Sequence, residues 1–158
     1  MTRIKLDKID RKILRDLQSN GRITNVELSK NAGISAPPCL RLVRALEENG
    51  LIQGYYARLD AQALGYGLSV FAHIKLVSQA EQDLKAFEMA VAELRPVREC
   101  HMLSGEVDFL LRIVAKDWDS YQQFLTEKLT ALDNVTSVKT MPLVRSSKEK
   151  TGVPVHVD

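Results

Sequence analysis

Arg41 and Arg44 are the residues in this sequence best placed to do chemistry. On a helix that advances about 100° per residue, both arginines fall on one side, and Cys39, Val43 and Leu46 fall together on the other. The apolar side would pack inward and hold the cations outward. Duplex DNA presents phosphates and base edges that outward arginines bind. The pair therefore predicts a DNA-binding helix, with a merely solvated amphipathic helix as the alternative.

The first turn of this helix is free of bulky side chains, as insertion into the major groove requires. Ser35 is the predicted N-cap, and Pro38 lies in the first turn, where a missing amide hydrogen is tolerated. Leu40 borders the outward face, so its side chain either meets a thymine methyl group or is buried. The predicted DNA contacts are Ser35, Pro38, Leu40, Arg41 and Arg44.

A second group of polar residues surrounds Gly105, where two predicted strands turn. Glu106 and Asp108, two residues apart on a strand, would point to the same side and accept hydrogen bonds from a ligand ammonium group. Backbone amides near the turn would receive the carboxylate of the same ligand. These groups predict an amino-acid effector site, with Trp118 as an apolar wall. The alternative is that both carboxylates are solvated turn charges and that Trp118 belongs to the core.

Catalytic arrangements are not supported by the spacing of reactive residues. Cys100 and His101 are neighbours on a predicted strand and face opposite sides, so they do not form a thiolate pair. Ser104 and His101 have opposite strand parity, which argues against a serine triad with Asp108. The three histidines lack zinc-ligand spacing. We predict no enzymatic activity, no metal and no cofactor.

The charge of the chain is divided unevenly along its length. Of 158 residues, 45% are hydrophobic and 27% are charged, as in ordinary globular proteins. Residues 1–58 contain eleven Lys+Arg and six Asp+Glu, whereas residues 59–158 contain eleven and fourteen. A basic first part is typical of a protein that meets a polyanion there. Residues 1–16 lack the apolar run of a signal peptide, so we expect a cytoplasmic protein with reduced cysteines and no membrane contact.

The basic part is predicted to hold three helices, of which two have clear start signals. The first spans 7–19, with Asp7 as its cap and Asn20-Gly21 as a left-handed stop. The second begins at Thr24, where the Thr24 hydroxyl and the Glu27 carboxylate form a capping box.

The third helix carries the arginines and follows a short turn. The second helix ends near Gly33, the turn covers 31–35, and the third helix runs from Ser35 to Asn49 and stops at Gly50. This is a helix-turn-helix layout. The apolar and aromatic segment 51–59 is interpreted as an extended connector.

The second part alternates strand and helix periods. Apolar residues recur at every second position in four segments and at helical spacing in two others. The order is βαββαβ, a ferredoxin-like arrangement with one antiparallel sheet and two helices on one face. The predicted elements are strand 68–76, helix 84–94, strands 97–104 and 107–114 joined tightly at Gly105, helix 118–132 and strand 135–144.

Both faces of this sheet carry apolar side chains. Phe71 and Val77 lie on one side of the first strand, and Leu110 and Val114 lie on the other side of the third. One face packs on the helices, and an apolar second face is best covered by another subunit. We therefore predict a homodimer formed through the sheets or their edges.

Six short motifs occur in order along nearly the whole chain, and together they resemble the Lrp/AsnC family of transcriptional regulators. The resemblance implies a regulator whose first part binds DNA in pairs and whose second part dimerises, assembles further to tetramers or octamers, and often binds an amino acid. It also implies effector contacts from Met102, Gly105 and Asp108. The motifs are Leu6-Asp7-x-x-Asp10-x-x-Ile13-Leu14, Gly21-Arg22-Ile23, Glu27-Leu28-Ser29, Pro38-Cys39-Leu40-Arg41, Leu46-Glu47-x-x-Gly50-Leu51-Ile52 and Glu99-Cys100-His101-x-x-Ser104-Gly105-x-x-Asp108.

The chain departs from its relatives in the recognition helix. Leu42 and Ala45 stand where many relatives have arginines, so Arg41 and Arg44 are the remaining cations there. Loss of two cations would lower the salt slope of DNA binding by somewhat under about two.

We predict an α+β protein: an N-terminal winged helix-turn-helix of three helices and a C-terminal ferredoxin-like βαββαβ domain. The predicted ranges are a DNA-binding domain at 1–50, a linker at 51–66 and an effector-binding and oligomerisation domain at 67–158, with a mobile C-terminal end. The predicted function is a DNA-binding transcriptional regulator. The alternatives are an amino-acid sensor or assembly module without specific DNA binding, and an architectural protein that bends and coats DNA.

Overall fold

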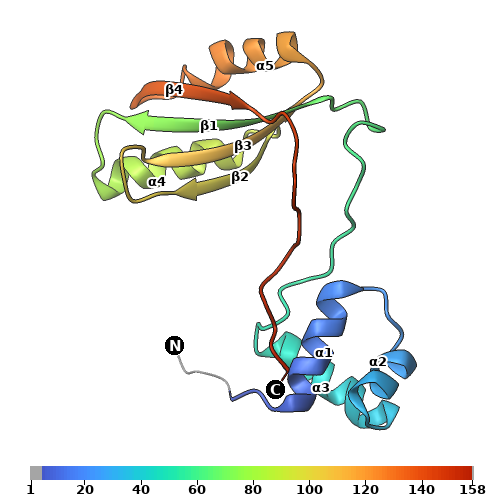
Figure 1. Cartoon of the computed structure of the whole chain (residues 1–158). Helices are drawn as coiled ribbons and strands as arrows, with labels where there is room; N and C mark the ends of the chain where they lie inside the picture. Colours follow the sequence, from blue (N-terminus) through green and yellow to red (C-terminus); the bar gives the residue numbers. More distant parts are fainter. Residues whose placement is uncertain (1–4, 158) are drawn as a thin grey trace. The chain divides into compact units, whose positions relative to one another are not determined.

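The computed structural model of the chain describes residues 5–157 and separates into two compact units (Figure 1). The first consists of residues 1–58 together with 148–158, and the second of residues 59–147. Residues 1–4, which begin the segment interpreted as lacking a signal peptide, lie outside the described part. None of the helices in residues 5–157 has the length and apolar character needed to cross a bilayer.

Helix α1 (Lys8–Ser19) opens the first unit with the predicted cap. The Asp7 carboxylate accepts a hydrogen bond from Asp10 N–H at 2.8 Å, and the Asp10 carboxylate accepts one from Asp7 N–H at 3.1 Å. The predicted left-handed stop at Asn20-Gly21 is wrong, because Asn20 is extended (φ −146°, ψ 92°). Its side-chain oxygen accepts from Arg22 N–H at 3.0 Å, and this turn ends the helix without a left-handed residue.

Helices α2 (Asn25–Ala32) and α3 (Ala36–Glu48) complete the helix-turn-helix. The predicted capping box of α2 is present, and Gly33 (φ 80°) closes the helix in the left-handed conformation that glycine adopts at no steric cost. The core of this unit is small, and α3 contributes two of its members. Its buried residues are Ile13, Leu28, Ala32, Cys39 and Leu46.

The connector after α3 has no regular secondary structure between residues 53 and 60. Its strand propensity is therefore not realised, although the segment is a connector as expected. Its beginning is fastened to α3, because Leu51 and Ile52 both donate backbone hydrogen bonds to the Leu46 carbonyl. Farther along, the Tyr55 ring lies so close to Gly21 that a Cβ there would be 3.3 Å from it.

The second unit is built on a four-stranded antiparallel sheet with the order β2-β3-β1-β4. The central strands are β1 (Leu68–Leu76) and β3 (Phe109–Ala115), and the edges are β2 (Val97–Met102) and β4 (Val135–Pro142). Alternate residues of β1 and β3 are buried, as their period of two predicted.

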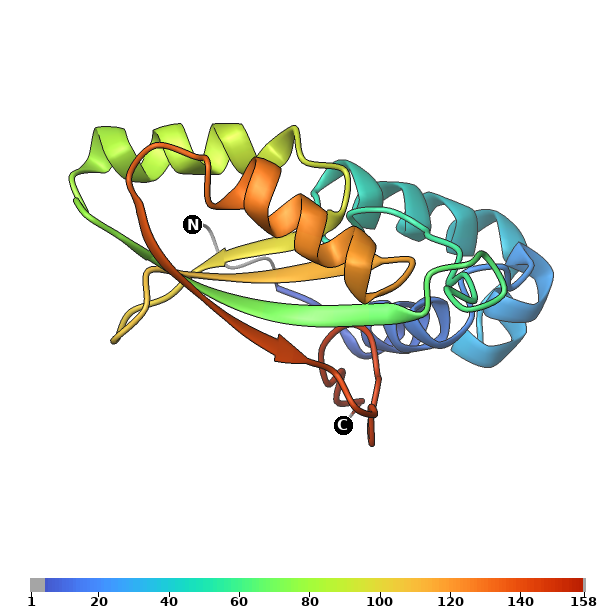
Figure 2. The same cartoon turned by 90° about the horizontal axis from the view of Figure 1, so that it is seen from above.

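Two helical segments cover one face of the sheet (Figure 2). They are α4 (Glu81–Ala92) and α5 (Trp118–Phe124), the latter continued by the π-helical turn η1 (Leu125–Leu129). The helices and the sheet enclose the larger core, in which Phe87 meets Phe109 with ring centroids 4.7 Å apart. The predicted fold class is thus confirmed.

The C-terminal residues are not the free end that the sequence led us to expect. After β4, residues 148–158 group with the helical unit. The assignment of residues 1–50 to DNA binding, 51–66 to a linker and 67–158 to effector binding and oligomerisation stays a prediction.

Candidate DNA-binding face and effector site

Helix α3 presents the predicted arginine pair to solvent. Arg41 and Arg44 are exposed, while Cys39 (0% exposed) and Leu46 (5%) lock the opposite side of the helix into the core. Neither arginine forms a salt bridge with any residue of the described part of the chain. Both guanidinium groups are therefore available to an external anion. Leu42 is half-buried and packs against the core.

The remaining predicted DNA contacts surround this pair. Leu40 is 40% exposed, so the alternative of a buried side chain is wrong. Pro38 is half-buried in the first turn. Ser35 holds the N-cap position, but its side chain makes no capping hydrogen bond, contrary to expectation. Its exposed hydroxyl is free to bind a phosphate.

The angle between α2 and α3 is held by a residue that the sequence did not single out. Asn25 Nδ2 donates to the Ala36 carbonyl at 2.9 Å, which joins the first turn of α2 to the first turn of α3. Asn25 Oδ1 is buried and has no partner within residues 5–157. Across the turn, Ile34 N–H donates to the Ser29 carbonyl at 3.0 Å. These bonds fix the first turn of α3 relative to α2.

Tyr55 fastens the connector to the last turn of α3. Its hydroxyl donates to Glu47 Oε1 at 2.9 Å. Burial, together with the hydrogen bond and the charge of Glu47, raises the pKa of Tyr55 to about 12. The hydroxyl therefore stays a donor throughout the physiological pH range, and this bond occupies one acidic group of α3.

The hairpin that carries the predicted effector residues is looser than expected. Residues 103–108 form a loop between β2 and β3, so the tight turn at Gly105 and the strand placement of Glu106 and Asp108 are wrong. Asp108 Oδ2 accepts from Leu76 N–H at 2.6 Å, and Asp108 N–H donates to the Ile74 carbonyl at 3.0 Å. Asp108 thus anchors the loop to the end of β1, and this draws it out of β3.

The tip of this loop keeps unused hydrogen-bonding groups. The backbone N–H groups of residues 104–107 have no acceptor within the described range, and the Glu106 side chain is exposed. Gly105 has φ 155° and open space around it. Met102, at the end of β2, is 60% exposed. Donors for a carboxylate, an acceptor for an ammonium group and an apolar side chain therefore lie on one short stretch of chain.

Trp118 does not belong to this group. It begins α5, directly after β3, whereas the loop 103–108 precedes β3. Seven strand residues at about 3.3 Å each separate the two by roughly 20 Å. Trp118 is 48% exposed and its ring lies 5.4 Å from that of Tyr121, so it is neither a wall beside Gly105 in the same chain nor a buried core residue.

Two cavities in the second unit lie away from the loop. One of about 230 Å³ is lined by Tyr66, Pro96, Phe124 and neighbouring residues, and one of about 340 Å³ lies between α4 and β2. Neither is lined by any predicted effector residue. Neither cavity therefore forms part of the predicted effector site.

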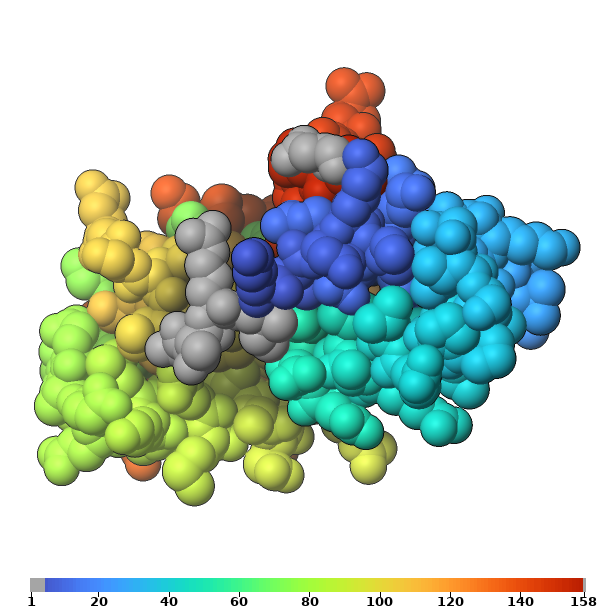
Figure 3. Space-filling model, turned by 90° about the horizontal axis from the view of Figure 1, so that it is seen from below, coloured from blue at the N-terminus to red at the C-terminus, as the bar shows by residue number. Residues whose placement is uncertain are grey.

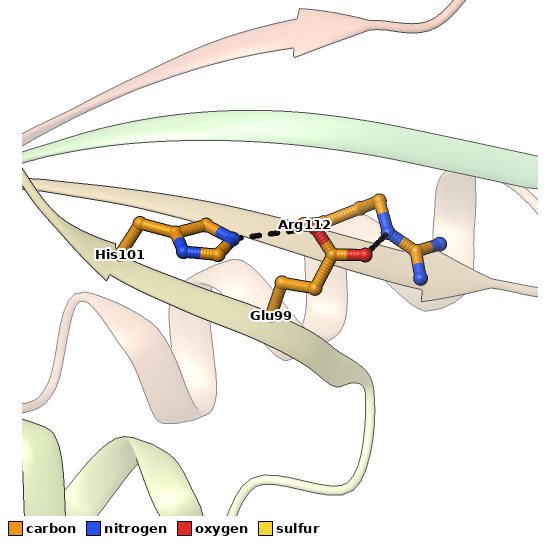
Figure 4. A network of polar contacts seen from close by, with 3 residues as sticks. All are labelled: Glu99, His101 and Arg112. Carbon is orange, nitrogen blue, oxygen red and sulfur yellow. Dashed lines mark hydrogen bonds and ion pairs between the residues drawn. The ribbon is translucent and has the colours of Figure 1, made fainter. Parts of the chain in front are cut away.

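The sheet face opposite the helices carries a polar network among apolar side chains. Glu99 on β2 accepts from Arg112 Nε on β3 at 2.5 Å and lies 3.4 Å from His101 Nε2 (Figure 4). Burial alone would raise the pKa of Glu99, but the hydrogen bonds and charges of Arg112 and His101 outweigh it, and the pKa lies below its ordinary value. Phe71 pairs with Arg112 in register, so an aromatic ring adjoins the network.

Comparison with known proteins identifies both units. Residues 6–53 match the family model for winged helix-turn-helix DNA-binding domains, and residues 69–153 match that for the Lrp/AsnC ligand binding domain. The leucine-responsive regulatory protein of Rhizobium meliloti is 52% identical over 98% of this chain and 99% of its own length. The protein of the same name from Escherichia coli K12 is 43% identical over 95% of this chain and 92% of its own length.

Solved structures agree with this assignment. A transcriptional regulator from Neisseria meningitidis, crystallised with L-methionine, superposes with a TM-score of 0.90 at 33% identity over 95% of this chain and 97% of its own. An AsnC family transcriptional regulator from Agrobacterium tumefaciens gives a TM-score of 0.87 at 33% identity over 94% and 97%. The chain therefore belongs to the Lrp/AsnC family of transcriptional regulators, with a helix-turn-helix DNA-binding unit followed by a ligand-binding domain.

Proposed function

We propose that α3 is the recognition helix and that Arg41 and Arg44 supply its main DNA contacts, with Ser35, Pro38 and Leu40 beside them. The observation that carries this proposal is the arrangement of α3, whose apolar side is buried while its two arginines are exposed and unpaired within the described residues. Ser35 would bind a phosphate, and Leu40 would contact a thymine methyl group.

DNA binding by these residues is tested by fluorescence anisotropy on a labelled duplex from upstream of the chain's own gene. Replacing Arg41 and Arg44 with Ala should weaken binding and lower the salt slope by somewhat under about two, at roughly 0.9 per phosphate contact. Arg95→Ala, which removes one exposed cation from the second unit, is the control and should leave both quantities unchanged. Unchanged affinity in the double variant would contradict the proposal.

The second unit is proposed to bind an amino acid at the loop 103–108. The N–H groups of residues 104–107 would hold its carboxylate, Glu106 its ammonium group, and Met102 its side chain. Asp108 would position the loop through its bond to Leu76 N–H. The L-methionine complex of the Neisseria meningitidis regulator and the leucine-responsive relatives favour an effector with an unbranched or γ-branched apolar side chain.

A thermal-shift panel of the twenty amino acids tests this site. A ligand of the folded state should raise the unfolding midpoint, because saturation at about a hundred times Kd adds about 2.7 kcal/mol. Glu106→Gln should abolish the shift for the amino acid that gives it, whereas Glu93→Gln, an exposed change at the end of α4, should preserve it. A flat panel would favour a regulator that needs no effector.

The open sheet face is proposed to form a homodimer, and contacts between neighbouring dimers would extend it to tetramers or octamers. Phe71, Leu110 and Val114 are half-buried on this face, and none of them belongs to the core that the sheet forms with the helices. A second copy would cover them and bring a second loop 103–108 into the assembly. Light scattering should show a dimer, and Phe71→Asp should dissociate it, while Met89→Asp on α4 should not.

We propose that the protein is a regulator without catalytic activity, like the transcriptional regulators to which it is similar. We assign it to the cytoplasm, the compartment of its DNA target. The comparisons give no support to a sensor without DNA binding or to an architectural protein. Footprints at defined half-sites about one helical turn apart would distinguish a specific regulator from a DNA-coating protein.

A further inference from the structure

The C-terminal segment docks on the DNA-binding unit through one side chain of α1. Gln18 Nε2 donates to the Val153 carbonyl at 2.8 Å, and Val153 N–H donates to Gln18 Oε1 at 3.0 Å. A primary amide thus pairs with both polar groups of one residue, as a neighbouring strand would. Figure 3 shows the red atoms of the C-terminal segment beside the blue atoms of the N-terminal helical region.

The sequence around Val153 suits this contact on both sides. Pro154 restricts the residue before it to extended conformations, in which N–H and C=O point the same way and can reach one amide. Gly152 has φ +81°, and a Cβ there would lie 2.1 Å from Gln18 Oε1. The backbone conformation therefore favours glycine at 152, and a Cβ there would push the Gln18 amide away from Val153.

Further contacts extend the docked segment in each direction. Arg58, in the connector, forms an ion pair with Glu149, and both side chains are largely exposed. The pair therefore contributes little to stability but helps to fix where the C-terminal segment lies along the connector. Beyond Pro154, Val155 and Val157 are half-buried while His156 is exposed. Alternate burial is what an extended peptide shows when one side lies on a surface.

We propose that the surface of α1 around Gln18 is a binding site for an extended peptide with the pattern Gly-x-Pro, and that its occupant is the C-terminal segment 148–157 of this chain. The site recognises the backbone of the middle residue and excludes any side chain at the first. Its occupation makes the segment a fourth element of a unit whose own buried core has five residues. The ligand-binding unit is then joined to the DNA-binding unit by two chain segments, the connector and this one.

Amide hydrogen exchange of the full-length protein tests the site without any DNA or effector. The Val153 amide should be protected, and Gln18→Ala should remove that protection and lower the unfolding midpoint of the helical unit. Gln18→Glu, which keeps an acceptor but loses the donor, should also weaken the contact. Two neutral hydrogen bonds predict a loss of protection of roughly 5- to 100-fold.

The effect of Gly152→Ala on the Gln18 contact can be separated from the strain of placing alanine at a positive φ, because the chain offers a matched control. Gly65 also has φ +81° but has open space around it, so Gly65→Ala measures the cost of the conformation alone. Gly152→Ala should reduce Val153 protection more in the wild-type chain than in the Gln18→Ala chain, since the collision needs both residues. A Val153 amide that exchanges as fast as in an unstructured peptide, or strictly additive effects of the two substitutions, would overturn the proposal.

Discussion

Truncation of Ile13 should unfold the DNA-binding unit while leaving the ligand-binding unit intact. Ile13 is 0% exposed in a core of five buried residues, whereas the ligand-binding unit has twelve. Ile13→Ala removes about three methylene equivalents at about 0.8 kcal/mol each and leaves a cavity that adds to the cost. The expected loss is about 3 kcal/mol, and Ile13→Val should lose about 1 kcal/mol. A loss of this size is a large fraction of the stability of a small unit.

Calorimetry and DNA-binding measurements on the same samples check this expectation. For a unit of this size, about 3 kcal/mol should lower its transition by at least about 12 °C, and DNA affinity should fall as the helical unit unfolds. Ile74→Ala, with the same residue type at 0% exposure in the ligand-binding unit, is the control and should lower the other transition instead. If Ile13→Ala lowered both transitions equally, the division into two separately stabilised units would be refuted.

Three further predictions concern individual hydrogen bonds and one small polar network. Thr24→Ala should destabilise the helical unit by about 1 kcal/mol in chemical denaturation because it removes a working capping box, whereas Ser35→Ala, at a cap position without a side-chain bond, should change stability by less than about 0.5 kcal/mol. Tyr121→Phe should lower the ligand-binding unit's stability by about 1 kcal/mol, since it breaks the partly buried 2.6 Å bond to Thr140. Because the pKa of Glu99 is lowered in the folded state, its network stabilises the fold above the ordinary pKa of 4.5, and this stabilisation is lost as pH falls through the lowered pKa. In thermal melts, Arg112→Leu should abolish this loss of stability at acid pH. The control Arg98→Leu should leave it in place.

The features that could be predicted from sequence are those fixed by residues close together in the chain. The caps of α1 and α2 each join residues three apart, and the period of two in β1 needs only its own nine residues. The outward position of Arg41 and Arg44 follows from helix periodicity alone. Even the separation of Trp118 from Gly105 was available, because the length of the intervening strand sets a minimum distance.

The features that were missed depend on partners distant in the chain or on competition between local bonds. Asp108 leaves the strand because Leu76, 32 residues earlier, donates to its carboxylate. The docking of the C-terminal segment has no local signal, because Gln18 is 135 residues from Val153. At Asn20 the signal was local but ambiguous, since an Asn-Gly pair suits either a left-handed stop or a side-chain turn, and the bond to Arg22 N–H selects the second.

The two candidate sites share one physical design, in which exposed polar groups are held by a buried or hydrogen-bonded attachment on their other side. In the DNA-binding unit, Cys39 and Leu46 hold α3 so that its arginines face solvent. In the ligand-binding unit, Asp108 ties the loop to the end of β1, and β1 pairs with both β3 and β4. The opposite end of β1 follows the connector, and β4 leads into the segment docked at Gln18. An effector bound at the loop as proposed would therefore act on β1, which follows the connector and pairs with β4. In the proposed dimer it would change DNA affinity only to the extent that it bound one arrangement of the paired helical units better than another.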